Sequence, residues 1–325
     1  MQIPKKSILS ALQGVAQATK TPEENTDQIK QLFASHYTQH VDSNSTTHTN
    51  GDATDERSFD DWNTLVKNNT LNLDDTALHI ARLALAISLL RETCRQNQPA
   101  SPKDLDQIWG IIHDALTSKN LSRNLFTANR SAQGLLAVPL CSLLKDGSID
   151  ELFRLHVWMP DGKRANPDFA LHSHQPFAQS WILAGEARDH AYQVDPVDDI
   201  AEATHAGYAL AWNDGKGQNR NYKTHQSYSI VQNTGKFFKA TETSTERHAR
   251  NDSYSIPAAA FHATEVAPDA LHATLFYFDS HRGFVKDAGV LGPKDGESYT
   301  QFRDPAGITP AELAEVVEAA RSESS

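Results

Sequence analysis

Three histidines in two separate segments are the residues of this chain whose types and spacing best suit chemistry. His172-Ser173-His174 precedes a run with strand character, and His262 follows a later strand-like stretch and the turn at Pro257. Alternate residues of a strand point to the same face, so the imidazoles of His172 and His174 would project together. Neutral imidazoles are good ligands for iron, copper, zinc and nickel. We therefore predict that the three histidines hold one divalent metal ion.

The alternative is that these are ordinary strand histidines, hydrogen-bonded in a core or turned to solvent. The chain has 15 histidines, so a single His-x-His triplet is a weak signal by itself. Two ordered motifs at strand-like positions are a stronger signal than either one alone. His156, on an apolar strand before the first motif, is expected to be structural.

The two segments resemble the paired motifs of the cupin superfamily. The first cupin motif runs His-x-His, Glu, Gly, and here Gln179 and Gly185 follow the histidine pair. The second motif centres on Pro-x-Gly-x-x-His, and here Pro257 is followed by Ala259 in the glycine position and then by His262. The resemblance covers roughly residues 150–285. It implies an RmlC-like jelly roll, the double-stranded β-helix barrel, with His172, His174 and His262 as metal ligands.

Within the cupins the chain is similar to the cysteine-dioxygenase-like proteins. Arg123-Asn124-Leu125 precedes a strand that ends at Trp158 and a turn at Gly162, and His172 comes next. In that family the arginine of this segment binds the substrate carboxylate, a task that suits the bidentate guanidinium fork. The resemblance makes Arg123 a candidate substrate-binding residue, and an ordinary surface or inter-domain salt bridge is the alternative.

Two further site residues depend on the same resemblance. Gln179 stands where cupins carry a glutamate ligand, so it is either a weak ligand or a hydrogen-bond partner of another ligand or of the substrate. Tyr277, in the stretch Leu275–Asp279, stands near the place of the family's catalytic tyrosine, but no histidine occupies the place of the family's catalytic histidine. We assign Gln179 and Tyr277 as candidate catalytic residues and do not expect cysteine itself to be the substrate.

These residues lead to a hypothesis of a mononuclear non-haem dioxygenase, with Fe(II) as the expected metal and zinc, nickel or manganese as alternatives. Three neutral ligands leave a cationic centre, which favours a small anionic or chelating substrate together with O₂. A cupin without redox chemistry is a second hypothesis, either a small-ligand-binding protein or a metal-assisted isomerase or hydrolase. A storage or scaffold barrel without metal is a third.

The elements that must position these residues change in character along the chain. Residues 1–125 are expected to form an α-helical region with a flexible polar loop at 41–57. Residues 126–290 are expected to form a mostly β barrel with a less regular polar insert at 195–252, in which some strand is expected over 206–212 and 226–239, and residues 291–325 are expected to form a tail. Short β-rich runs separated by turn residues favour an antiparallel sandwich or barrel. Helices are expected over residues 5–20, 23–39, 59–69, 74–97, 102–118 and 309–321.

Composition excludes several classes of protein. The net charge of −11 disfavours binding to phosphate backbones, so no nucleic-acid partner is expected. The longest apolar stretch, Ala77 to Leu90, contains His79 and Arg82 and is too short to span a bilayer. Two cysteines in 325 residues fit a reducing compartment, which predicts a cytoplasmic protein. The helical region is expected to pack on the barrel or to form a homodimer contact.

Overall fold

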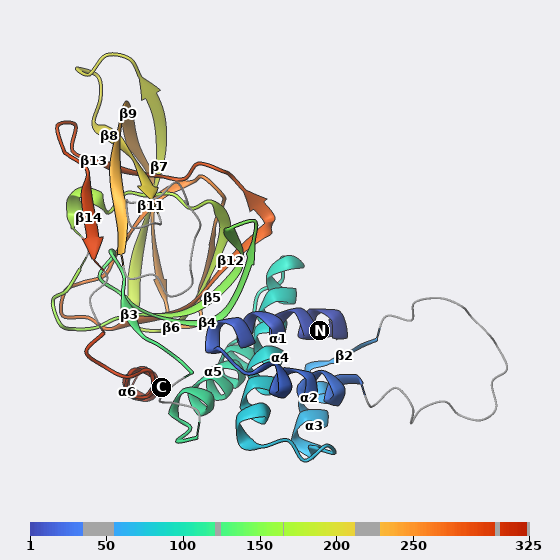
Figure 1. The fold of residues 1–325 in the computed structure, drawn as a ribbon. Helices are drawn as coiled ribbons and strands as arrows, with labels where there is room; N and C mark the ends of the chain where they lie inside the picture. Colours follow the sequence, from blue (N-terminus) through green and yellow to red (C-terminus); the bar gives the residue numbers. More distant parts are fainter. Residues whose placement is uncertain (35–54, 121–124, 165, 212–227, 303–305, 324–325) are drawn as a thin grey trace.

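The computed structural model describes residues 1–34, 55–120, 125–164, 166–211, 228–302 and 306–323. Strand residues outnumber helix residues, and the strands form antiparallel sheets, as the sequence predicted. The helices pack together beside the sheets (Figure 1). Among the described residues, no helix is both long enough and apolar enough to cross a membrane.

Within its described residues, the helical part has five helices in the predicted places. They are α1 (Lys5–Thr19), α2 (Glu23–Ala34), α3 (Phe59–Asn68), α4 (Asp75–Arg95) and α5 (Pro102–Thr117). Local sequence explains their starts, because Asp74 caps α4 and Ser101 forms a capping box with Asp104 at α5. A short strand, β1 (Gln2–Pro4), pairs with β2 (Glu56–Ser58), which the sequence did not indicate. Most of the predicted loop at 41–57 lies outside the described residues.

The first large sheet has the strand order β10-β6-β12-β5-β4-β3. Its strands are β3 (Asn129–Arg130), β4 (Leu136–Lys145), β5 (Ser148–Trp158), β6 (Pro176–Ala184), β10 (Ser253–Ile256) and β12 (His272–Phe284). Side chains alternate between its two faces. One face carries Phe153, Leu155, Trp181 and Leu275 into a hydrophobic core shared with the helices. The other face turns into the barrel, where Leu152, Ala178, Ile256, Phe276 and Phe278 form a separate cluster.

The second sheet has the order β11-β7-β9-β8-β13, and β14 also pairs with β9. Its strands are β7 (Glu186–Val197), β8 (His205–Ala211), β9 (Tyr228–Ala249), β11 (Phe261–Glu265), β13 (Gly289–Gly292) and β14 (Tyr299–Phe302). The strand expected over 206–212 and 226–239 in the polar insert is confirmed by β8 and by the first half of β9, but β9 continues beyond residue 239 to Ala249. Polar side chains on both faces of residues 240–249 hid this continuation, because alternating hydrophobicity is the sequence signal of a strand.

The antiparallel pairs of the barrel are nested along the chain. β7 pairs with β9, β6 with β10, His172 with His262 of β11, and β5 with β12. The strands of successive pairs alternate between the two sheets, so the chain from β5 to β12 resembles one long hairpin wound around a common interior. This winding brings His172 and His262 to the same wall, although 90 residues separate them.

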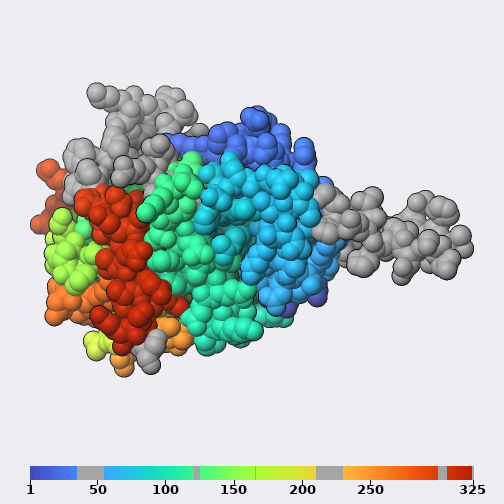
Figure 2. Space-filling model, turned by 90° about the horizontal axis from the view of Figure 1, so that it is seen from below, coloured from blue at the N-terminus to red at the C-terminus, as the bar shows by residue number. Residues whose placement is uncertain are grey.

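The C-terminal helix α6 (Pro310–Glu323) begins with a capping box, in which Thr309 and Glu312 exchange hydrogen bonds. It packs against α5, where the Trp109 indole donates to Glu318 at 2.6 Å. Figure 2 shows the C-terminal segment, in red, beside the green and teal helices on this face of the molecule. The tail therefore closes over the junction between helices and barrel.

Candidate metal centre

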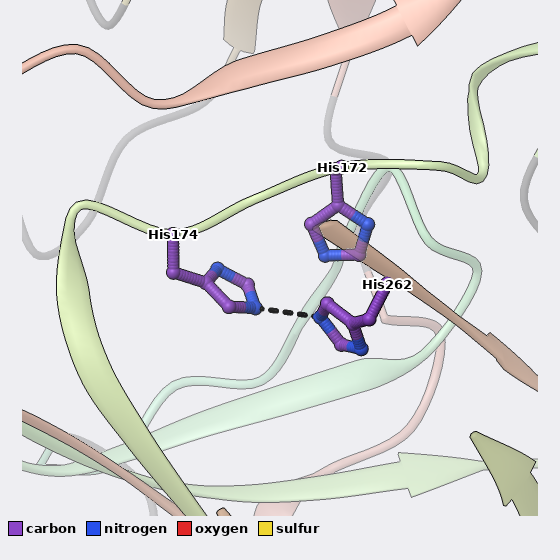
Figure 3. Close-up of side chains that lie close together, drawn as sticks. All are labelled: His172, His174 and His262. Atoms are coloured by element: carbon purple, nitrogen blue, oxygen red, sulfur yellow. Dashed lines mark hydrogen bonds between the residues drawn. The ribbon is translucent and has the colours of Figure 1, made fainter. Parts of the chain in front are cut away.

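The imidazoles of His172, His174 and His262 point toward one another inside the barrel (Figure 3). One ring nitrogen from each lies within 4.8 Å of the others, and Nε2 of His174 is 3.0 Å from Nε2 of His262. Bonds from imidazole nitrogen to a metal such as zinc are about 2.0–2.1 Å long, so one ion can bridge nitrogens 3.0 Å apart.

Backbone pairing on both sides fixes the segment that carries two of these histidines. The His172 amide donates to the His262 carbonyl at 3.0 Å, and the His262 amide donates back at 2.9 Å. On the other side, the Ser173 amide donates to Gly289 of β13 at 2.9 Å. Residues 171–173 thus join the two outermost strands of the second sheet, which makes the histidine backbone rigid.

The turn before β11 explains how His262 is directed back to the other two histidines. Ala259, in the position where the cupin motif has glycine, adopts φ +66°. Its amide donates to the carbonyl of His174 at 3.0 Å, which ties the turn to the first motif. A residue with a Cβ is disfavoured in this left-handed conformation by about 1–2 kcal/mol, so the position is one where glycine would be favoured.

Hydrogen bonds to the outer nitrogens orient two of the rings. Nδ1 of His172 lies 2.8 Å from the carbonyl oxygen of Ala170, so it must donate, and Nε2 is left with its lone pair. Nδ1 of His262 lies 2.9 Å from the carboxylate of Asp189 on β7, which also accepts from Thr264 at 3.1 Å. A carboxylate or carbonyl behind a ligating imidazole is a recurring feature of metal sites.

Burial keeps the imidazoles of His172 and His174 neutral. It lowers the pKa of His172 to about 3, and the neighbouring His262 adds to the effect. Burial also lowers the pKa of His174 well below its usual value, with contributions from the other two histidines, His156 and Arg154. Neutral imidazoles present lone pairs at pH 7, and an all-nitrogen donor set suits iron, copper, zinc or nickel.

The candidate catalytic residues Gln179 and Tyr277 do not join this centre, which corrects their assignment. They lie opposite each other in the β6–β12 register and share the face that packs on the helices. Tyr277 stacks on Phe153 with ring centroids 3.9 Å apart, and the Gln179 amide donates to the carbonyl of Tyr254 at 2.9 Å. Side chains alternate between the two faces of a strand. Ala178 and Phe276 face the interior, so Gln179 and Tyr277, which directly follow them, point away from it.

Arg123, the candidate substrate-binding residue, lies outside the described residues. Sequence reading missed Asp189, which lies between two charged or polar residues on β7 and has no hydrophobic alternation to mark its inward direction. Only the pairing of β7 with β11 brings it behind His262, because Asp189 lies opposite Thr264 in that register.

A second acidic group on the outer face of the first sheet is unsuited to a cation. Asp150, Glu151 and His281 lie close together there. However, Arg91 and Arg95 already bind Glu151 at 2.7 and 2.8 Å, and their positive charges oppose a metal ion. Among the described residues, the three-histidine group is therefore the better candidate metal centre.

No protein-family model and no curated protein matches this chain.

Proposed function

We propose that the protein is a mononuclear metalloprotein in which His172, His174 and His262 bind one divalent ion. The observation that carries this proposal is the convergence of three imidazoles, with ring nitrogens of two of them only 3.0 Å apart, in a site where His172 and His174 are half-buried and His262 is buried. Two rings are also oriented from behind by Ala170 and Asp189. Core histidines without a ligand rarely need such an arrangement, whereas metal sites use it regularly.

We further propose that the barrel is of the jelly-roll type found in cupins. The nested pairing of β5 with β12, of His172 with β11, of β6 with β10 and of β7 with β9 supports this interpretation. The positive φ of Ala259, at the glycine position of the second cupin motif, supports it independently.

The reaction that we propose is oxidation of a small anionic or chelating substrate by O₂. Fe(II), when bound, would supply the redox chemistry, with its remaining positions open to substrate and O₂. The three histidines hold the ion without neutralising its charge, which favours an anion. Phe276 and Phe278 contact His174 with ring centroids 5.9 and 5.0 Å away, so they exclude water from one side of the centre.

A zinc-dependent, non-redox reaction is the second candidate. The hydrogen bond from His262 to Asp189 favours it, because zinc sites commonly pair a ligating imidazole with a carboxylate. Three protein ligands with one open position are also the usual composition of a catalytic zinc site.

Elemental analysis of protein purified without an affinity chelate tests the proposal. We expect about one metal ion per chain in the wild type, and its loss from His172→Ala and His262→Ala variants that keep their circular dichroism. His281→Ala, in the group that we consider unsuited to a cation, is the matched control and should retain the metal. A wild type that binds no metal even after reconstitution would exclude the metalloprotein hypothesis.

The nature of the metal then decides between the two reactions. Iron in the purified protein, with substrate-dependent O₂ uptake that requires added Fe(II), is the result expected for the dioxygenase. Zinc in the purified protein, with no O₂ uptake after iron loading, would favour the non-redox reaction.

A further inference from the structure

One wall of the barrel interior carries polar side chains beyond the three histidines. On β5, Arg154 and His156 lie two and four residues after the inward-facing Leu152, and on β12, Thr274 lies two residues before the inward-facing Phe276. Because side chains alternate along a strand, these three residues face the interior too. His156 and Thr274 lie directly opposite each other in the β5–β12 register. They therefore lie side by side on the surface that faces the metal centre.

Two polar atoms on this wall are buried without a hydrogen-bond partner among the described residues. They are Nε2 of His156 and Oγ1 of Thr274, on residues that are 7% and 2% exposed. Buried polar groups in folded proteins nearly always have a partner, because an unsatisfied one loses the hydrogen bond that water would have made. Two such atoms on facing residues indicate a place where a polar group from a ligand completes the hydrogen bonds.

This pair lies next to the candidate metal centre. The His156 ring stacks on Phe276 at 4.9 Å and an interplanar angle of 19°, and Phe276 in turn contacts His174. Arg154 lies close enough for its charge to lower the pKa of both His156 and His174. One molecule bound over Phe276 could therefore contact the metal, the arginine and the His156–Thr274 pair.

We propose that His156 and Thr274 form a substrate subsite that binds a hydroxyl group, and that the substrate is a small carboxylate carrying that hydroxyl. This inference rests on the proposed function and names its substrate class. The metal and Arg154 supply positive charge for the carboxylate. The buried imidazole is neutral, so it and the threonine hydroxyl match an uncharged donor and acceptor group. Phe276 and Phe278 make the surroundings of this subsite apolar, so the carbon skeleton of the acid is also accommodated.

Calorimetric titration with matched pairs of probes tests the subsite. 3-Hydroxybenzoate and 4-hydroxybenzoate are each compared with benzoate, and mandelate with phenylacetate. We expect at least one hydroxy acid to bind about five- to tenfold more tightly than its partner, the effect of one hydrogen bond. The proposal is overturned if no hydroxy acid binds more tightly than the acid that lacks the hydroxyl.

Two variants connect that preference to the named residues. Thr274→Val nearly keeps the side-chain volume and His156→Phe keeps an aromatic ring on Phe276, so each replaces the polar atoms by apolar ones. Both should abolish the hydroxyl preference and leave the midpoint of urea unfolding unchanged or higher, because an unsatisfied buried group is removed. Thr241→Val, at an exposed position on β9, is the control and should keep the preference.

A purely structural role for the pair gives the opposite result, in which both variants unfold at lower urea and the hydroxyl preference persists. The titrations are performed on zinc-loaded and on metal-free protein, and metal content is measured for every variant. A wild type that binds no metal but still prefers the hydroxy acids would reject the proposed function and keep the subsite. A wild type that binds metal but shows no preference for the hydroxy acids would keep the proposed function and reject the subsite.

Discussion

Asp189 is the residue on which the orientation of His262 depends. Its carboxylate accepts from Nδ1 of His262 at 2.9 Å and is itself held by Thr264. We expect Asp189→Asn to weaken metal binding about 10- to 100-fold while the fold is kept, because the ring loses its charged partner. Titration of metal against a competing chelator measures the change. Asp195→Asn, at an exposed position on the same strand, is the control, and equal affinities for both variants would contradict the role of Asp189.

The buried imidazoles make the metal-free protein sensitive to acid. Burial lowers the pKa of His172 to about 3 and that of His272 to about 4, and it lowers the pKa of His156 well below 6.5. In the unfolded chain these groups take up protons near pH 6.5, whereas in the folded chain they do not. The free energy of unfolding should therefore fall as the pH drops from 6.5 towards 4, by up to about 1.4 kcal/mol per pH unit for each histidine.

Urea unfolding of the metal-free protein at several pH values checks this sign. In the His156→Phe variant, the free energy of unfolding should fall less steeply with decreasing pH, by the equivalent of one proton, because one imidazole has been removed. A free energy of unfolding that is constant or rises as the pH drops from 6.5 to 4 would contradict the prediction.

At the scale of elements, α4 is joined to the barrel by buried charges. Arg91 is 1% exposed and binds Glu151 of β5 at 2.7 Å, while Arg95 binds both Glu151 and Asp279 of β12. Glu151→Gln leaves the Arg91 guanidinium buried with no carboxylate facing it. We expect a loss of about 3–5 kcal/mol in the free energy of unfolding, measured with urea.

The control for this prediction is Glu315→Gln on α6, where the side chain is 64% exposed and pairs with His113. This substitution should change the free energy of unfolding by less than about 1 kcal/mol, as for other exposed ion pairs. Equal effects at the two positions would show that the α4 contact does not depend on charge.

At the scale of the whole molecule, helices and barrel share one hydrophobic core. Trp62, Leu85 and Ile112 of the helices belong to the same cluster as Phe153 and Trp181 of the sheet. We expect a fragment of residues 126–325 to lack a cooperative unfolding transition, because its sheet would expose an apolar face that the helices normally cover. Circular dichroism during heating measures this, and a cooperative transition in a soluble fragment would show that the barrel folds alone.

The sequence by itself determined the helices, the antiparallel character of the second half and the three histidines that converge. Caps and helical periodicity act locally, as at Asp74 and Ser101, so they can be read from neighbouring residues. The two histidine motifs were equally readable, because His-x-His spacing and a proline turn are local features that strand geometry converts into direction.

Only the tertiary structure decided which face each strand residue occupies. Gln179 and Tyr277 differ by one position from Ala178 and Phe276, which face the interior, and no local signal fixes that parity when both faces of the sheet are buried. Asp189 and His156 became site residues through pairing with distant strands, β11 and β12. Which side chains of a strand point inward, and which strands pair, depend on what covers each face of the sheet. That is a property of the folded chain rather than of any one segment.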